Sequence, residues 1–360
     1  MEIKIKKTLN FVRRIGHWIQ DRKQFLTMER NERVDEFPEK IIDEIRKKIN
    51  SYSLRTYPDD INSIYAKIAV WQKIKKNELI VTQGADGGLL RIFSTFANVG
   101  DKVLFLDPSY AMYPVYSKIF KCKPIPLNLD LEFSSKKYFE ILKNKIYVSK
   151  PKLVLIANPN QPIEVKLDLK HLEKLSKICK KTKSILVIDE AYYHFNSITG
   201  KSLIKKFNNV FIVRTFSKAF GLAGLRVGYT ISNKKNIETL QTVKPIYEIN
   251  NINIAIINYF LNKLNLMHDY TLQIKKSRKL IRNRMRKFDS VKLFGKYSNT
   301  VLLKLKSKQQ MIHIFQALKK NNILVKKGDL NSNIFYLRIT LGSVKITRKL
   351  INILEKNLYE

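Results

Sequence analysis

Short apolar runs rich in Val, Ile and Leu alternate along the chain with longer segments in which apolar residues recur at helical spacing. Runs of this kind are typical of strands that are buried on both faces, and the alternation favours βαβ units on a mostly parallel sheet. The expected strands are residues 79–81, 102–106, 152–157, 185–189, 210–214 and 226–231. The clearest helix is 168–181, which Asp168 can cap, and another is expected from about 86 to 97.

The pattern changes after about residue 235. A long helical region through residue 285 precedes strands near 301–305 and 335–339, with a helix at 309–321 between them. This order predicts a separate, smaller α+β domain. We therefore expect an N-terminal arm and helix (1–50) that contribute to the small domain or a dimer, a large domain (51–240) and a small C-terminal domain (241–360).

The chain is strongly basic, with 68 Lys and Arg against 30 Asp and Glu. The excess is mostly Lys, runs through the whole sequence and accompanies heavy use of Ile, Asn, Phe and Tyr, which indicates an A/T-rich coding bias. A protein that neutralises phosphates concentrates its charge along a groove. The densest cluster, 278–287, has helical spacing and is interpreted as a solvated face, so we do not expect a nucleic-acid partner.

Cysteine and histidine are sparse. Cys122 and Cys179 allow no disulfide framework, and the five histidines show no zinc-type pairing, so no metal is expected. No apolar run approaches the roughly 20 residues of a membrane helix, and the first twenty residues lack a signal-peptide core. These features predict a cytoplasmic protein without a membrane association.

Chemically suggestive residues follow the expected strands, at the edge where open α/β sheets bind ligands. A glycine-rich turn at 84–88 opens a helix, Asp189 ends one strand, and Lys218 follows the next, with Arg226 shortly after. Each feature alone is weak, since it also fits a turn, a helix cap or one lysine in a basic chain. Their combination indicates a site for an anionic ligand near a helix start.

The stretch 213–229, VRTFSKAFGLAGLRVGY, resembles the cofactor-lysine segment of fold-type I aminotransferases, which use pyridoxal 5′-phosphate, and is closest to the histidinol-phosphate aminotransferase group. The resemblance extends from about residue 32 to 342, through the further anchors TYP (56–58), GAD (84–86), DPSY (107–110), NPNQP (158–162), DEAY (189–192) and LRI (337–339). It implies an α/β fold, with a mostly parallel seven-stranded sheet in the large domain and a smaller α+β C-terminal domain.

The resemblance also implies roles. Lys218 binds the cofactor through its amine and then carries the proton between the substrate α-carbon and the cofactor. Asp189 pairs with the pyridine nitrogen, Tyr192 donates to the ring oxygen, and Tyr110 stacks on the ring. The residues expected around the cofactor phosphate are Ala85, Asp86, Thr215, Ser217 and Arg226. Tyr57 is expected to reach the phosphate of a neighbouring subunit in an obligate homodimer with shared active sites, and Arg338 to clamp a substrate carboxylate.

Three segments depart from the family pattern. Gln161-Pro162-Ile163-Glu164 stands where Asn-Pro-Thr-Gly is usual, so Gln161 takes the place of the Asn that contacts the ring oxygen. Either the loop is reshaped around Glu164, or the ring contact is made differently. An Arg that helps hold the substrate phosphate in the histidinol-phosphate group is replaced by Val325, followed by two lysines. The arm 29–33 reads ERNER where Asn-Glu-Asn-Pro is more common.

Three functions remain open at this point. The first is transfer of an amino group between an amino acid, with glutamate as the main candidate donor, and a small oxo compound that carries a phosphate or lacks one. The second is decarboxylation of a phosphorylated amino acid, as in threonine-phosphate decarboxylases, because the sequence does not report which α-carbon bond stands perpendicular to the ring. The third is a non-catalytic basic binding protein on the same fold. Regulators of that type add a helix-turn-helix domain, for which we expect no room before residue 32.

Overall fold

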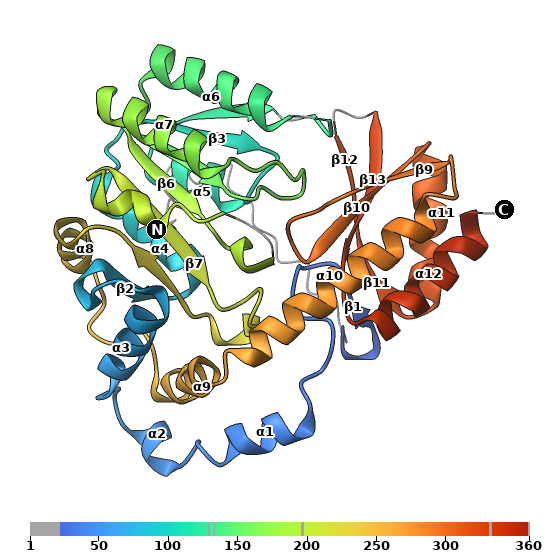
Figure 1. Cartoon of the computed structure of the whole chain (residues 1–360), viewed down its shortest axis with the longest axis horizontal. Helices are drawn as coiled ribbons and strands as arrows, with labels where there is room; N and C mark the ends of the chain where they lie inside the picture. Colours follow the sequence, from blue (N-terminus) through green and yellow to red (C-terminus); the bar gives the residue numbers. More distant parts are fainter. Residues whose placement is uncertain (1–21, 129, 133, 196–197, 331–332, 359–360) are drawn as a thin grey trace, which may run out of the picture.

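A computed structural model describes residues 22–128, 130–132, 134–195, 198–330 and 333–358. The larger of two units is built on a seven-stranded sheet in the order β2-β8-β7-β6-β5-β3-β4, on the left of Figure 1. Its strands are β2 (Leu79–Thr82), β3 (Lys102–Asp107), β4 (Lys123–Asn128), β5 (Leu153–Ala157), β6 (Ile185–Asp189), β7 (Val210–Thr215) and β8 (Gly228–Ile231). Strands β3 to β7 pair in parallel and β8 is antiparallel to both neighbours, so the predicted, mostly parallel sheet is confirmed.

Two strands of the large sheet differ from the sequence prediction. Strand β4 was not predicted because Pro124 and Pro126 interrupt its apolar pattern, and its place at the sheet edge is where proline is tolerated. Strand β8 begins at Gly228 and not at Arg226, because Arg226 has a φ of 53° and ends the preceding turn in the left-handed conformation.

Helices cover both faces of the large sheet. On one face, α4 (Gly84–Phe96), α5 (Met112–Ile119) and α8 (Lys234–Gln241) enclose an apolar core. On the other face, α3 (Ile61–Gln72), α6 (Ser135–Ser149) and α7 (Leu169–Lys181) enclose a second core that continues into the smaller unit. The predicted cap of α7 is confirmed, since the Asp168 side chain accepts the N–H of His171 at 2.8 Å.

The smaller unit, on the right of Figure 1, holds an antiparallel sheet in the order β12-β13-β10-β9. Its strands are β9 (Val291–Phe294), β10 (Thr300–Leu305), β12 (Lys326–Leu330) and β13 (Ile334–Thr340), and its helices are α10 (Asn265–Met285), α11 (Lys308–Lys320) and α12 (Val344–Leu358). Near the N-terminus, β1 (Leu26–Thr27) pairs in parallel with β11 (Ile323–Leu324), which fastens the start of the described chain to this unit.

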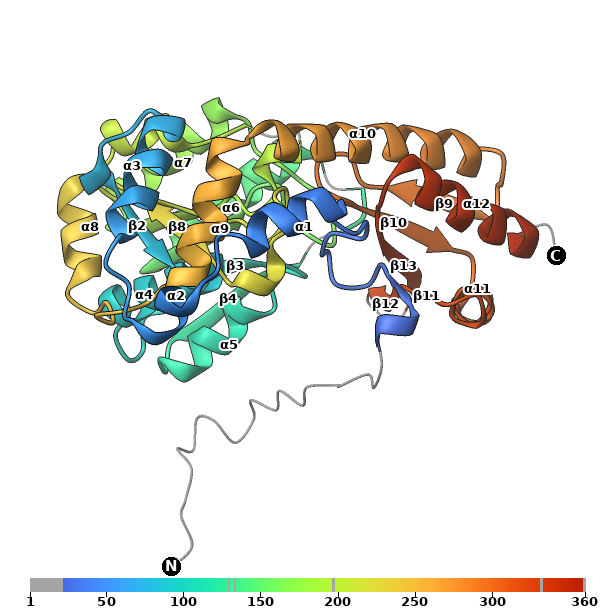
Figure 2. The same ribbon diagram turned by 90° about the horizontal axis from the view of Figure 1, so that it is seen from below.

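Three helices and several turns complete the chain. Helix α9 (Asn251–Asn262) packs against α1 (Glu39–Arg46), α2 (Ser51–Arg55) and α3, and α10 then runs onward along the smaller unit, as Figure 2 shows. Short 3-10 turns lie at Arg22–Gln24, Lys76–Glu78, Tyr193–Phe195, Lys201–Lys205 and Ala223–Leu225. The domain division at residues 50 and 240 stays a prediction, and residues 1–21 of the expected arm lie outside the described residues. Every helix within the described ranges is too short or too polar to cross a lipid bilayer.

Candidate active site

A cavity of about 310 Å³ lies where β5, β6 and β7 end, between the start of α4 and the sheet of the smaller unit. It collects nearly all the side chains that the sequence singled out, although they come from segments far apart in the chain. The expected site residues that line it are Ala85, Asp86, Tyr110, Gln161, Asp189, Tyr192, Thr215, Ser217, Lys218, Arg226 and Arg338.

Asp189 supplies a buried carboxylate at the end of β6, where only 6% of the residue is exposed. The Tyr113 hydroxyl donates to its Oδ2 at 3.0 Å, and the Ala191 N–H donates to its Oδ1 at 3.0 Å. Burial raises the pKa of Asp189 to about 6, against the lowering effect of these two donors. A cationic ring nitrogen next to this carboxylate would offset the cost of its burial.

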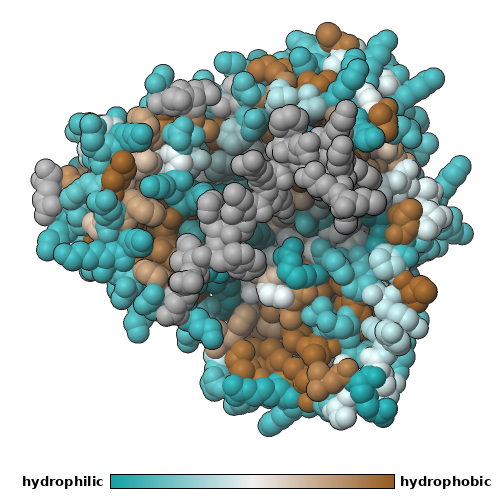
Figure 3. All heavy atoms as spheres, turned by 180° about the vertical axis from the view of Figure 1, so that it is seen from behind, coloured by the Kyte–Doolittle hydropathy of each residue, from teal (hydrophilic) through white to brown (hydrophobic). Residues whose placement is uncertain are grey.

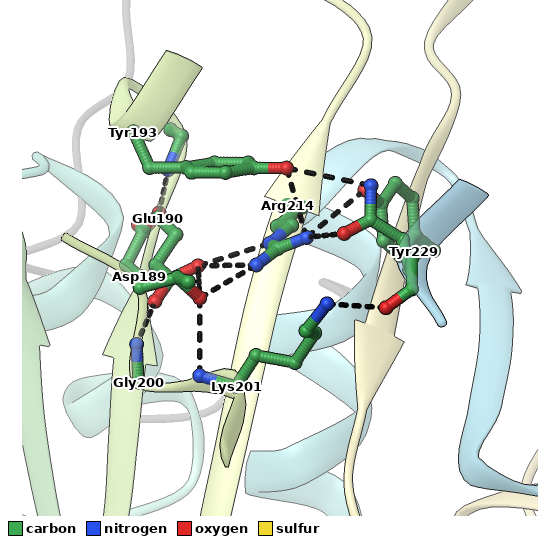
Figure 4. A network of polar contacts seen from close by, with 10 residues as sticks. Asp189, Glu190, Tyr193, Gly200, Lys201, Arg214 and Tyr229 are labelled. Atoms are coloured by element: carbon green, nitrogen blue, oxygen red, sulfur yellow. Dashed lines mark hydrogen bonds and ion pairs between the residues drawn. The ribbon is translucent and has the colours of Figure 1, made fainter. Parts of the chain in front are cut away.

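Glu190, the residue after Asp189, belongs to a network of polar contacts at this end of β6 (Figure 4). Glu190 accepts hydrogen bonds from Nε and Nη2 of Arg214 on β7, at 2.9 and 2.8 Å. It also accepts from the Thr199 hydroxyl at 2.9 Å and the Gly200 N–H at 2.6 Å. Burial lowers the pKa of Arg214, but the Glu190 carboxylate outweighs it and raises this pKa above its ordinary value. The pair fixes β6 to β7 and thereby holds Asp189 toward the cavity.

Lys218 enters the cavity from the loop that follows β7. Its Nζ donates to the main-chain oxygen of Asn31 at 3.0 Å and lies 5.7 Å from the centre of the Tyr192 ring. Asn31, at a φ of 59°, also donates its side-chain amide to the Tyr192 hydroxyl oxygen at 2.7 Å. The hydrogen of Tyr192 therefore stays available for an acceptor in the cavity. Lys218 and Asp189 face the same space, as the sequence predicted.

An anion cradle lies at one end of the cavity. The first N–H groups of α4, at Ala85 and Asp86, lack intrahelical acceptors, and the Ser217 and Thr215 hydroxyls and Arg226 stand beside them. The Asp86 carboxylate accepts hydrogen bonds from the hydroxyls of Tyr110 and Tyr116, at 3.0 and 2.8 Å.

Glycine is required beside this cradle. A Cβ on Gly228 would overlap the main chain of residues 84 and 85, so glycine at this position lets β8 approach the start of α4 closely. Gly84 itself has a φ of 70°, and a Cβ there would come within 3.4 Å of Arg226 Nη2. The backbone thus leaves the space in front of the helix start open to a phosphate.

Gln161 lines the cavity, but its amide is already bonded within the protein. The Nε2 atom donates both hydrogens, to Glu164 Oε1 and to Ser298 Oγ, each at 2.7 Å. Its Oε1 accepts from the Thr300 hydroxyl at 2.9 Å. Of the two possibilities that the sequence left open for this loop, these bonds favour a contact with the ring oxygen that is made differently, without the Gln161 amide.

Arg338 reaches the cavity from β13 of the smaller unit. Its Nη2 donates to the main-chain oxygen of Glu29 at 2.8 Å, and its Nε is buried without a protein partner among the described residues. Lys326 on β12 pairs directly opposite Arg338, so the two cations lie on the same face of the sheet. Val325, by contrast, is buried, with 5% of its surface exposed.

Tyr57 is the one expected site residue that does not line the cavity of its own chain. It is 73% exposed and stacks on Tyr247, with the ring centroids 4.3 Å apart. The sequence prediction placed its function in a neighbouring subunit, which a single chain does not test.

Sequence reasoning missed two residues that orient the site. Tyr113 binds Asp189, and its spacing of three residues from Tyr110 near a helix start was a usable signal. Asn31 binds both Lys218 and Tyr192 through contacts that span most of the chain, and no local pattern could have indicated them.

The residues present therefore fit pyridoxal 5′-phosphate. The buried carboxylate suits the ring nitrogen, the lysine amine suits the aldehyde, and the helix start with its hydroxyls and guanidinium suits the phosphate.

Comparisons with known proteins agree with this fit. Residues 24–354 match the family profile described as Aminotransferase class I and II. A histidinol-phosphate aminotransferase from Thermoanaerobacter sp. (strain X514) is 32% identical over 329 residues, which cover 90% of this chain and 91% of the relative. The relative from Methanocaldococcus jannaschii, with the same name, is 29% identical over 326 residues, covering 88% of this chain and 84% of its own.

Solved structures share the fold. The histidinol-phosphate aminotransferase of Sinorhizobium meliloti in complex with pyridoxal-5′-phosphate superposes with a TM-score of 0.87 at 18% identity, covering 100% of this chain and 98% of its own. The L-threonine-O-3-phosphate decarboxylase of Porphyromonas gingivalis superposes with a TM-score of 0.78 at 20% identity, covering 93% and 100%. At these identities the two likenesses establish the fold alone.

Proposed function

Because the chain belongs to the class I and II aminotransferases, which depend on pyridoxal 5′-phosphate, we propose that it moves an amino group between an amino acid and a small oxo compound. Glutamate is the first donor to test. Phosphorylated oxo compounds are the first acceptors to test, because the curated relatives named above are histidinol-phosphate aminotransferases.

One observation carries the proposal: the Lys218 amine and the Asp189 carboxylate line the same cavity. When bound, the cofactor supplies an electron-withdrawing ring. Asp189 keeps the ring nitrogen protonated, and Lys218, once free, takes the proton from the substrate α-carbon. Tyr192, oriented by Asn31, donates to the ring oxygen. We assign this donation to Tyr192 alone, since Gln161 uses both amide hydrogens elsewhere.

The remaining assignments follow the cavity walls. We place the cofactor phosphate against the start of α4, with Ser217, Thr215 and Arg226, and let Tyr110 stack on the ring. Arg338 holds a substrate carboxylate as a planar fork.

Lys326, opposite Arg338, supports an anionic group at the same end of the substrate. Its point charge stands in for the Arg that histidinol-phosphate aminotransferases carry, so a phosphorylated substrate remains compatible with this chain.

We further propose a homodimer in which Tyr57 completes the phosphate site of the partner. Its exposed ring, the exposed Tyr247 beneath it and the nearby Ile246, which is 84% exposed, support a protein contact at this surface. The rear face in Figure 3 likewise gathers hydrophobic side chains in its lower part, against a mostly hydrophilic surface. A cytoplasmic location is supported by two cysteines that are both free and buried.

The test is to supply purified, cofactor-loaded protein with glutamate and a panel of phosphorylated and unphosphorylated oxo compounds, and separately with phosphorylated amino acids, and to measure 2-oxoglutarate and carbon dioxide in each case. Formation of 2-oxoglutarate that depends on one acceptor, and that Lys218→Ala abolishes, supports the proposal. Release of carbon dioxide from a phosphorylated amino acid without 2-oxoglutarate would identify a decarboxylase. Failure of every acceptor would refute the proposed transfer.

A further inference from the structure

A hydrogen-bonded clasp joins the two units beside the cavity. Glu164, in the loop between β5 and α7, reaches the loop 295–299 between β9 and β10 of the smaller unit. Its Oε2 accepts the main-chain N–H groups of Lys296 and Tyr297, the second at 2.7 Å, and its Oε1 accepts from the Ser298 hydroxyl. Charged acceptors of main-chain N–H groups form strong hydrogen bonds.

Gln161 completes the clasp on the cavity side. Its amide bonds Glu164 and Ser298, and its oxygen accepts from Thr300. Ser298 and Thr300 are buried, with 0% and 2% of their surfaces exposed, so water does not compete for these bonds. The Gln161 side chain, which lines the cavity, is therefore held by hydrogen bonds to other residues of the clasp.

The same loop is held from its other side by α10. Arg278 donates to the main-chain oxygens of Lys296, at 2.8 Å, and Ser298, and Arg282 donates to that of Gly295. Burial lowers the pKa of both arginines, and Glu164 opposes this shift through its negative charge. The loop is thus bound between two arginines of one unit and one carboxylate of the other.

This loop leads directly into the strand that positions the substrate arginine. Strand β10 starts at Thr300, and its pairing with β13 sets Leu302 opposite Arg338 and Thr300 opposite Thr340. A shift of the loop relative to the large unit would therefore shift Arg338 relative to Lys218. By the resemblance, Gln161 and Glu164 stand where the family usually has Asn and Gly. A glycine has no side chain that could form the bonds of Glu164.

We propose that Gln161 and Glu164 are positioning residues, which hold the Arg338 strand at the distance from Lys218 that an anionic substrate requires. The inference rests on the proposed function for its substrate. Their action runs through loop 295–299 and β10, without contact between Glu164 and the substrate.

The first measurement needs neither cofactor nor substrate. Hydrogen exchange of the Lys296 and Tyr297 amides in the cofactor-free protein is expected to become about tenfold faster in Glu164→Gln, because each amide loses a charged acceptor. The matched control is Glu132→Gln, which removes an exposed ion pair to Lys292 that also crosses between the units. Unchanged exchange in Glu164→Gln would show that the clasp does not form.

The second measurement separates positioning from general stability. In the cofactor-loaded protein, Glu164→Gln is expected to raise the KM for glutamate about tenfold, while kcat and the affinity for pyridoxal 5′-phosphate change less than twofold. If Glu164→Gln folds poorly, Ser298→Ala takes its place in this measurement. It removes one buried hydroxyl of the clasp and should raise the KM for glutamate as well.

Faster exchange with an unchanged KM, or with a fall in kcat or in cofactor affinity alone, would overturn the positioning role. A wild-type protein without turnover would instead refute the proposed function, and the exchange result would still decide whether the clasp forms.

Discussion

The Lys218 amine donates a hydrogen bond to the main-chain oxygen of Asn31, 3.0 Å away, although the two residues are 187 positions apart. The Asn31 N–H in turn donates at 3.0 Å to the hydroxyl of Thr340, the last residue of β13. Lys218 of the large unit is thereby tied, through one short segment near the N-terminus, to the sheet that carries Arg338. The side of the cavity that we assign to the cofactor and the side that we assign to the substrate are thus connected by these bonds as well as by the clasp.

Replacement of Asp189 by Asn should make the stability of the cofactor-free protein less dependent on pH. Asp189 has a pKa raised to about 6, so its stabilising contribution is fully present below the unfolded-state value of about 3.9 and is lost as pH rises through 6. From pH 5 to pH 8, the free energy of unfolding of Asp189→Asn should rise by about 1 kcal/mol relative to that of the unmodified chain. Urea unfolding at several pH values measures this difference.

The cofactor supplies the control for this prediction. Added pyridoxal 5′-phosphate should stabilise the unmodified chain more than Asp189→Asn, because the ionised carboxylate then has a cationic partner. Equal pH dependence of the two cofactor-free proteins would argue against a raised pKa for the buried Asp189 carboxyl.

Arg214 should be far more important for stability than an exposed arginine. Arg214→Met leaves Glu190 buried with 0% of its side chain exposed and without its cation, at an expected cost of about 3–5 kcal/mol in the free energy of unfolding. Arg284→Met removes a pair to Glu355 in which the arginine is 46% exposed, and should cost less than about 1 kcal/mol. Urea unfolding at neutral pH compares the two, and similar losses would contradict the role of the buried pair.

Much of the fold could be predicted because its signals are local. Apolar runs identified the parallel strands, and the carboxyl ends of adjacent strands β6 and β7 necessarily brought Asp189 and Lys218 to one edge. Strand β4 was not predicted because proline fits a strand only at the edge of a sheet. Which strand lies at the edge is set by the assembled sheet and cannot be seen in the local sequence.

The contacts that tune the site could not be predicted from the sequence. Glu164 appeared only as an unusual replacement of glycine, since its partners in the other unit lie more than 130 positions away along the chain. Asn31 was passed over for the same reason. Its contacts with Lys218 and Thr340 depend on how the two units pack, which no periodicity encodes.

Tyr57 should contribute to cofactor binding although it lies outside the cavity of its own chain. Tyr57→Phe removes a hydroxyl that we place on the partner's phosphate, and the affinity for pyridoxal 5′-phosphate should fall about tenfold. Tyr52→Phe, which changes another exposed tyrosine that binds Asp59, is the matched control.

Sedimentation should accompany this titration and give twice the mass of one chain. A single-chain mass, or a Tyr57→Phe protein with unchanged affinity, would exclude the shared site.

The most direct test of the central claim is to reduce cofactor-loaded protein with borohydride and to map the modified lysine by mass spectrometry. We predict one label per chain on the peptide that contains Lys218. In Lys218→Ala, we expect no other lysine to be labelled to that extent. The abundance of other lysines makes this comparison stringent, because nonspecific labelling would spread over the surface. A label shared among many lysines, and equal in both proteins, would contradict the account.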